Sequence, residues 1–175
     1  KPGDINDLNL HPLQKKLAIE LAKTKKPIIL LINSGRPRII TDIESLSSAT
    51  INLYLPGNYG GDALSDILVG KVNPSGKLPY SYPSYVNSLV PYNYKPSDIQ
   101  NNSQGAYNYV GEVNYLYPFG YGLSYSSFEY SNLEVDKNIY KINDTIKINV
   151  SVKNNSSLLG KETIQLYSKD NYATL

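Results

Sequence analysis

The stretch that most constrains the fold runs from residue 55 to residue 79 and reads LPGNYGGDALSDILVGKVNPSGKLP. It holds five of the 12 glycines and three of the 11 prolines in the chain. Pro56 cannot donate a ladder hydrogen bond and Gly57 can adopt positive φ, so together they predict the end of a strand. A helix is expected from about Asp62 to Val69, and the turn formers at 73–76 end that part of the chain.

The residues before this stretch alternate in a way that predicts a parallel sheet covered by helices. A helix is expected to begin at Pro12, because proline suits the first helical position and Leu13, Leu17 and Leu21 follow at a spacing of four. Residues 27–32 (PIILLI) form a continuous apolar run, which is typical of a strand buried on both faces. A short helix at 42–48 and a strand at 50–55 complete a strand, loop and helix repeat, so the fold class expected is α/β.

Between residues 80 and 130 the chain becomes rich in tyrosine and proline and loses helical periodicity. A disordered linker is depleted in aromatic residues, so we expect an ordered connection. Two interpretations of the tyrosines remain open. They pack the irregular segment onto the domain surface, or they form a platform for sugar rings.

The last part of the chain has strand character in FEYSNLEV, TIKINVSV and ETIQLYS. Ile146, Ile148, Val150 and Val152 alternate with polar residues, which predicts one buried and one wet face. Three such strands predict the beginning of a β-sandwich. Only seven residues follow Ser168, and the chain opens on loop residues without Met, so we expect a fragment of a longer protein.

Composition excludes several classes of function. The chain has 175 residues, of which 41% are hydrophobic, which is enough for one substantial core. A net charge of +2 does not favour nucleic acid or an anionic membrane as a partner. The chain has no cysteine, so it can form neither a disulfide framework nor a thiolate nucleophile. Its single histidine gives little support for a histidine-based zinc site or a Ser/His/Asp triad. No apolar run approaches the roughly 20 residues of a membrane span.

Three long segments resemble, in order, three successive segments of glycoside hydrolase family 3: KPIILLINSGRPRII, LPGNYGGDALSDILVGKVNPSGKLPYSYP and LYPFGYGLSYSSFEYSNLEV. The resemblance implies an enzyme with a (β/α)₈ barrel, a parallel-sheet α/β sandwich domain and a fibronectin type III-like domain. It implies an α/β sandwich domain at residues 1–90, partial at its N-terminus. The tyrosine-rich connection would be 91–127, and the start of an incomplete β-sandwich of fibronectin type III-like fold would be 128–175.

Retaining glycosidases need two carboxyl groups about 5 to 5.5 Å apart. The resemblance places the nucleophile Asp on the barrel and the acid/base Glu just upstream of Lys1, so we expect no catalytic residue in this chain. Asp4 lies in the loop leading from that position and is a candidate for substrate binding, with turn capping as the alternative. Asp7 is expected to cap the same loop. No metal or cofactor is expected.

Other polar residues have structural interpretations. Asp62 and Asp66 lie four residues apart, on one face of one expected helix. Acidic side chains are stabilising near the N-terminus of a helix, which is the simpler explanation for both. Glu112 has no evident partner carboxylate, so we do not assign it a catalytic role. Arg36 and Arg38 flank Pro37 at the end of a strand, where they could hold a substrate hydroxyl or a neighbouring carboxylate. The default expectation for both is a structural or surface ion pair. The glycines at 57–61 match neither dinucleotide-binding nor P-loop spacing.

The resemblance implies that the intact protein removes terminal non-reducing β-D-glucosyl residues from glucosides or short oligosaccharides, with secretion or periplasmic export. Its partners would be the carbohydrate substrate and the barrel domain. The alternative is a non-catalytic carbohydrate-binding or scaffold module that uses the tyrosine-rich segment as its platform.

Overall fold

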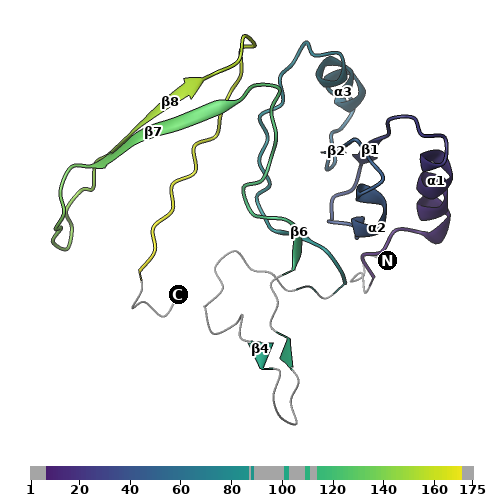
Figure 1. The fold of residues 1–175 in the computed structure, drawn as a ribbon, viewed down its shortest axis with the longest axis horizontal. Helices are drawn as coiled ribbons and strands as arrows, with labels where there is room; N and C mark the ends of the chain where they lie inside the picture. The colour runs from purple at the N-terminus through teal and green to yellow at the C-terminus, as the bar shows by residue number, and fades with distance from the viewer. Residues whose placement is uncertain (1–6, 87, 89–100, 103–108, 111–113, 171–175) are drawn as a thin grey trace. The chain divides into compact units, whose positions relative to one another are not determined.

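A computed structural model describes residues 7–86, 88, 101–102, 109–110 and 114–170 (Figure 1). The chain divides into two compact units. The α/β unit consists of Lys1–Ala63, Leu78–Tyr121 and Leu166–Leu175, and the hairpin unit consists of Leu64–Lys77 and Gly122–Gln165. None of the helices in the described part of the chain is long and apolar enough to cross a membrane.

The α/β unit is built on two parallel strands. Strand β1 (Ile29–Ile32) pairs with β2 (Ala49–Asn52), and helix α2 (Thr41–Glu44) lies between them in the chain. Helix α1 (Pro12–Ala22) precedes β1 and begins at the proline that the sequence predicts. The parallel pairing confirms the α/β prediction, because parallel strands require a crossover and α2 lies within it.

The core of this unit gathers Ile32, Ile40, Ile43 and Tyr82, which are at most 6% exposed. These four residues come from β1, the loop before α2, α2 itself and strand β3 (Tyr82–Pro83). Burying a large apolar side chain contributes about 1.5 to 3 kcal/mol, so this small cluster is the main hydrophobic contribution to the unit. Partly buried residues pack around it: Leu10, Ala18, Leu30, Leu78, Tyr80, Leu116 and Tyr117.

The prediction that residues 27–32 are buried on both faces is wrong for this chain. Side chains alternate across a strand, and in β1 only the face that carries Ile32 packs against the core. Ile29 and Leu31 point the other way and remain 49% and 41% exposed. The leucines expected as an apolar stripe on α1 are exposed too, since Ala18 of that helix is the residue that packs on the core.

Strand β2 ends at Asn52, three residues earlier than expected, and Tyr54 just after it adopts a positive φ of 54°, which lies outside the regular β region. The turn that follows uses the glycines as the sequence predicts. Gly57 has a φ of 70°, and a Cβ on Gly60 would lie 2.6 Å from the Pro56 ring. Helix α3 (Gly60–Leu68) therefore starts at a residue that has to be glycine, two positions before the expected start.

Short antiparallel pairs complete the α/β unit. Strand β3 pairs with β6 (Tyr115–Tyr117), and β4 (Asn101–Asn102) pairs with β5 (Tyr109–Val110).

Tyrosine rings contact one another around β3 and β6. The centroids of Tyr80 and Tyr82 are 6.1 Å apart, Tyr82 meets Tyr117 edge to face at 6.1 Å, and Tyr117 stacks on Tyr121 at 4.9 Å. For these four residues the packing interpretation is confirmed, because their faces are used within the protein. Tyr92, Tyr94 and Tyr107 lie outside the described residues, so the platform interpretation stays open there.

The hairpin unit contains the antiparallel strands β7 (Phe128–Val135) and β8 (Ile148–Asn154). Their register shifts between Ser131 and Glu134, where Asn132 has a φ of 52° and forms a bulge. The expected third strand at 162–168 is not formed, since that segment joins no ladder in the structure. The expected buried face is also absent from β8, whose apolar residues are all at least 36% exposed, because two strands alone cannot bury a face.

Within the hairpin unit, Asn73 connects the segment after α3 to the segments that flank β7 and β8. Its Oδ1 accepts hydrogen bonds from the Ser124 hydroxyl and the Tyr125 N–H, both at 2.8 Å. Its Nδ2 donates to Ser126 Oγ at 2.8 Å and to the Leu159 carbonyl at 3.0 Å. The side-chain amide therefore uses both donors and both lone pairs.

A second link lies beside it. Lys77 Nζ donates to the Gly122 carbonyl at 2.7 Å and lies 3.5 Å from Glu162, with both side chains mostly buried. Gly122 has no room for a Cβ because the Gly76 carbonyl occupies that position. Lys77 thus has a structural role, in agreement with the absence of a P-loop pattern around it.

Replacing Asn73 by alanine should lower the free energy of unfolding by about 2 kcal/mol, because it strands polar groups of Ser124, Ser126 and Leu159. Urea titration followed by circular dichroism measures this loss. Asn138→Ala is the matched control, since Asn138 is exposed. A loss no greater than that of the control would show that the four hydrogen bonds do not hold the hairpin unit together.

Candidate functional site

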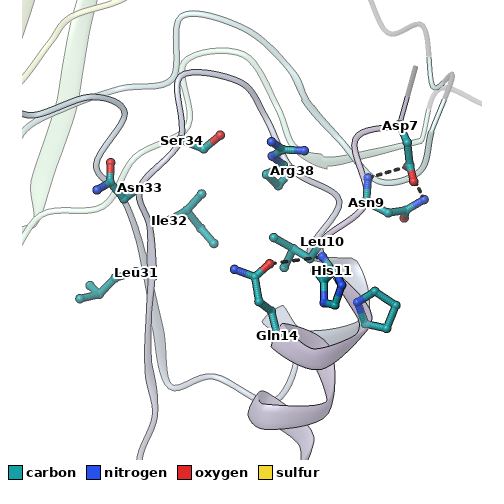
Figure 2. Close-up of a pocket in the computed structure, with 11 residues that line it drawn as sticks. Asp7, Asn9, Leu10, His11, Gln14, Leu31, Ile32, Asn33, Ser34 and Arg38 are labelled. Atoms are coloured by element: carbon teal, nitrogen blue, oxygen red, sulfur yellow. Dashed lines mark hydrogen bonds between the residues drawn. The ribbon is translucent and has the colours of Figure 1, made fainter. Parts of the chain in front are cut away.

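A polar pocket of about 530 Å³ opens at the carboxyl end of β1 (Figure 2). In open α/β sheets, ligands bind outside the carboxyl ends of the strands, and this volume falls within the range of small-molecule sites. The lining comes from the loop before α1, the first turn of α1, the end of β1 and the loop after it: Asp7, Asn9, Leu10, His11, Pro12, Gln14, Leu31, Ile32, Asn33, Ser34 and Arg38.

The N-terminus of α1 forms one wall, and its own residues cap it. The Leu13 N–H donates to His11 Nδ1, and the His11 N–H donates to Gln14 Oε1, both at 3.2 Å. These reciprocal contacts form a capping box, which satisfies N–H groups that a helix otherwise leaves without partners. The capped end therefore offers less to an anion than an open helix N-terminus does.

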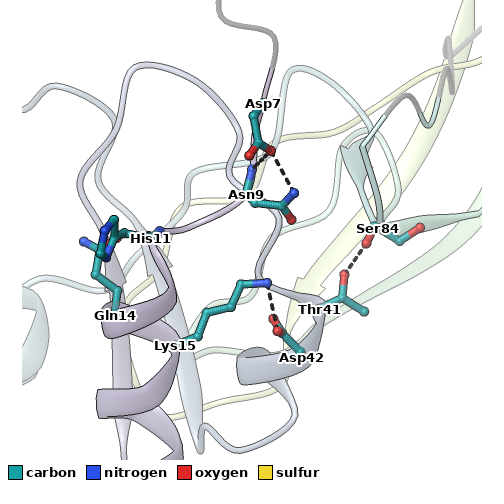
Figure 3. A network of polar contacts seen from close by, with 8 residues as sticks. All are labelled: Asp7, Asn9, His11, Gln14, Lys15, Thr41, Asp42 and Ser84. Atoms are coloured by element: carbon teal, nitrogen blue, oxygen red, sulfur yellow. Dashed lines mark hydrogen bonds and ion pairs between the residues drawn. The ribbon is translucent and has the colours of Figure 1, made fainter.

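Asp7 stands beside this wall and orders the loop that leads into α1. Its Oδ1 accepts from the Asn9 N–H at 2.8 Å and from Asn9 Nδ2 at 2.7 Å (Figure 3). The expected capping role of Asp7 is therefore confirmed. A carboxylate has further acceptor capacity on its second oxygen. Asp4, the residue proposed from the sequence for substrate binding, lies outside the described residues.

Arg38 is held at the opposite side through its main chain. The Tyr82 hydroxyl accepts from the Arg38 N–H at 3.2 Å and donates to the Arg38 carbonyl at 2.8 Å. The Ile39 N–H donates to the Leu8 carbonyl at 3.0 Å, and Asn9 and Ile39 form a parallel bridge. These contacts bring the loop before α1 beside the loop after β1, so the side chains of both line one pocket.

The guanidinium of Arg38 lies in the pocket between the side that carries Asn33 and Ser34 and the side that carries Asp7 and Asn9 (Figure 2). Within the part of the chain that the structure describes, it forms no ion pair. The surface ion pair expected by default for this residue is thus not formed there. Burial raises the pKa of the Tyr82 hydroxyl. The hydrogen bond with the main chain of Arg38 and the positive charge of Arg38 act in the opposite direction, but burial outweighs them.

Further contacts join α1, α2 and the segment after β3 (Figure 3). Lys15 Nζ lies 2.9 Å from the Asp42 carboxylate, and the Thr41 hydroxyl donates to the Ser84 carbonyl at 2.6 Å. Asp42 is half exposed, so this ion pair stabilises the arrangement only modestly.

Tyrosines occupy the carboxyl end of β2, next to β1. Asn52 Nδ2 donates to the Tyr80 hydroxyl at 3.1 Å. Burial, with a smaller contribution from Tyr54, raises the pKa of Tyr80 to about 12, so its hydroxyl stays neutral over the physiological range. These side chains close this part of the edge as a packed cluster.

Three other acids of the described chain occupy structural positions. Asp62 lies in the first turn of α3, as expected, and Asp66 pairs with Lys71 at 3.0 Å. Glu44 accepts a 2.6 Å hydrogen bond from Tyr117, and burial together with that carboxylate raises the pKa of Tyr117. Glu112 lies outside the described residues. Nor do the described residues contain a group of acids, histidines or cysteines suited to a metal ion.

These observations define an α/β protein with a pocket at the carboxyl end of a parallel strand. Comparison with known proteins gives the family. The model of the glycosyl hydrolase family 3 C-terminal domain matches residues 2–125. The chain belongs to this family.

The relatives found are glycosidases. A beta-xylosidase of Formosa agariphila is 35% identical over 174 residues, covering 99% of this chain and 24% of that protein. The lysosomal beta glucosidase of Dictyostelium discoideum is 35% identical over 184 residues, covering 98% of this chain and 21% of that protein. Among solved structures, a beta-glucosidase from Listeria innocua has a TM-score of 0.77 at 31% identity, covering 87% of this chain and 22% of that one. The chain thus spans between a fifth and a quarter of the length of these proteins.

Sequence reasoning missed part of this site. Asn33 and Ser34 follow β1 directly, so the rule for carboxyl ends of parallel strands was enough to select them. His11 and Gln14 gave a weaker signal, because a histidine at the N-cap is not among the preferred capping residues. No local pattern places Tyr82 on the main chain of Arg38, 44 residues away.

Tyr82→Phe should lower the free energy of unfolding by about 1 to 3 kcal/mol, because it leaves the partly buried N–H and carbonyl of Arg38 without their partner. Tyr85→Phe is the control, since that ring is 49% exposed. Urea unfolding of both variants measures the difference. Equal stability of the two variants would contradict the role assigned to the Tyr82 hydroxyl.

Proposed function

We propose that this chain is the α/β part of a retaining family 3 enzyme that hydrolyses terminal non-reducing β-D-glucosyl residues. The observation that carries the proposal is the 35% identity over nearly the whole chain to proteins described as a beta-xylosidase and a beta glucosidase. One of the solved relatives, at 29% identity, is a beta-glucosidase 3B of Thermotoga neapolitana in complex with alpha-D-glucose. A polar pocket at the carboxyl edge of β1 is consistent with a part of the protein that contacts sugar.

The domain organisation proposed is an α/β sandwich domain at 1–90, a tyrosine-rich connection at 91–127 and the start of a fibronectin type III-like domain at 128–175. The antiparallel pair of β7 and β8 supports the last assignment, because a β-sandwich is assembled from such pairs.

Catalysis is proposed to lie on parts of the protein other than this chain, with the nucleophile on a barrel domain and the acid/base group preceding Lys1. The described acids of the α/β unit support this division. Asp7 caps a turn, Asp42 pairs with Lys15, and Glu44 accepts from Tyr117. A retaining glycosidase instead needs two carboxyl groups about 5 to 5.5 Å apart and facing the scissile bond. Asp4 remains the proposed substrate-binding residue of the opening loop.

The substrate proposed is a β-glucoside or a short oligosaccharide, and the proposed partner of the chain is the barrel domain. A location outside the cytoplasm is proposed because the relatives include proteins described as periplasmic and lysosomal.

The 175-residue chain alone should release no nitrophenol from p-nitrophenyl β-D-glucoside, whereas the complete gene product should release it at a rate proportional to enzyme concentration. A heat-inactivated sample is the control for each. Turnover by the chain alone would place the catalytic carboxyl groups within it. Absence of turnover by the folded complete product on both the β-glucoside and the β-xyloside would contradict the proposed function.

A further inference from the structure

The first turn of α1 depends for its main-chain partners on a single residue, His11. Pro12 has no N–H to donate. The Gln14 and Lys15 N–H groups donate to the His11 carbonyl at 2.9 and 3.3 Å. The Leu13 N–H donates to His11 Nδ1 at 3.2 Å. Since a helix leaves its first N–H groups without partners inside the helix, His11 supplies the acceptors that this turn needs.

The contact with Leu13 determines the protonation state of the imidazole. Nδ1 accepts a hydrogen bond, so it carries no proton, and the ring proton of the neutral imidazole lies on Nε2. In an imidazolium both nitrogens are donors, so Nδ1 can no longer accept from the Leu13 N–H. Serine, threonine and asparagine caps keep their oxygen acceptor near neutral pH and below it, whereas this cap exists in one protonation state only.

Protonation also places a positive charge at the N-terminus of the helix, which carries a partial positive charge of its own, so a cation there is destabilising. Two charged groups of neighbouring segments line the same pocket as His11. Asp7 of the preceding loop attracts an imidazolium, and Arg38 of the loop after β1 repels it. Lys15 of α1 is paired with Asp42 of α2. With opposite charges from the two loops, the lost acceptor and the helix dipole decide that protonation opens the cap.

The cap lies where its opening changes the pocket at the carboxyl end of β1. His11 and Gln14 both line this pocket (Figure 2). The His11 N–H donates to Gln14 Oε1 at 3.2 Å, so the two residues are joined at the pocket wall. Opening the cap frees the Leu13 N–H and adds a positive charge to a lining that otherwise holds one arginine and one carboxylate.

We propose that His11 is a pH-sensitive cap, whose neutral imidazole closes the first turn of α1 and whose protonation opens that turn at the wall of the pocket. An imidazole ordinarily changes its charge between pH 5 and pH 8, so the turn is closed at the upper end of this range and open at the lower end. This change in α1 occurs whether or not the complete protein is a hydrolase.

The test follows the labelled 175-residue chain by NMR between pH 8 and pH 5. The chain holds one histidine, so the imidazole signal belongs to His11. The Leu13 amide signal should move with the same midpoint as the His11 Cε1–H signal, because one protonation changes both groups. Corrected for the intrinsic exchange rate, the Leu13 amide proton should be about fivefold less protected at pH 5, the equivalent of the roughly 1 kcal/mol that an N-cap contributes.

Two substitutions of His11 supply the controls. Asparagine is a preferred N-cap whose acceptor does not titrate, so in His11→Asn the Leu13 amide should keep its protection from pH 8 to pH 5. Alanine offers no acceptor, so in His11→Ala this amide should be about fivefold less protected than in the unchanged chain at pH 8, and the two chains should converge at pH 5. If His11→Ala loses its dispersed spectrum, the comparison with His11→Asn decides.

Two results would overturn the inference. One is a Leu13 amide whose signal and protection stay constant while the His11 imidazole titrates. The other is an equal pH dependence of this amide in His11→Asn and in the unchanged chain. Both readouts are made on the chain without substrate, so their failure leaves the proposed hydrolytic activity of the complete gene product untouched.

Discussion

The hydrogen bonds between the buried hydroxyl of Tyr82 and the main chain of Arg38 are the contacts on which the α/β unit most depends. Tyr82 is 2% exposed and belongs to the core with Ile32, Ile40 and Ile43. Its ring and its hydroxyl have different structural roles. The ring fills the core, and the hydroxyl closes the loop that follows β1. Since Ile39 is bonded in turn to the loop before α1, this single side chain determines how the two walls of the pocket meet.

Residues 55–79, the most distinctive stretch of the sequence, have a structural role outside the pocket. Gly60 leaves room for the Pro56 ring, and the Gly76 carbonyl lies where a Cβ on Gly122 would stand. The polar residues Asn73 and Lys77 of this stretch bond the segments that flank β7 and β8. The stretch therefore identifies the family through its packing requirements and contributes no residue to the pocket.

Helix starts and turns depend on neighbouring residues and could be predicted from the sequence. The burial of strand faces depends on distant partners and could not. Pro12, Gly57 and the parallel strands followed from helix capping, positive φ and apolar runs. The burial of β1 on both faces and of one face of β8 did not follow, because burial requires neighbours that a local pattern cannot supply. Within the site, the turn role of Asp7 was predictable, whereas the position of the Arg38 guanidinium depends on Tyr82, far along the chain.

The Tyr82 hydroxyl holds the main chain of Arg38 and thereby ties the loop after β1 to the core of the α/β unit. Amide hydrogen exchange of Tyr82→Phe, compared with that of the unchanged protein, measures this directly. The amide protons of Arg38 and Ile39 should exchange faster in the variant, while those of β1 and β2 keep their protection. Equal protection of Arg38 and Ile39 in the two proteins would show that the hydroxyl does not hold this loop.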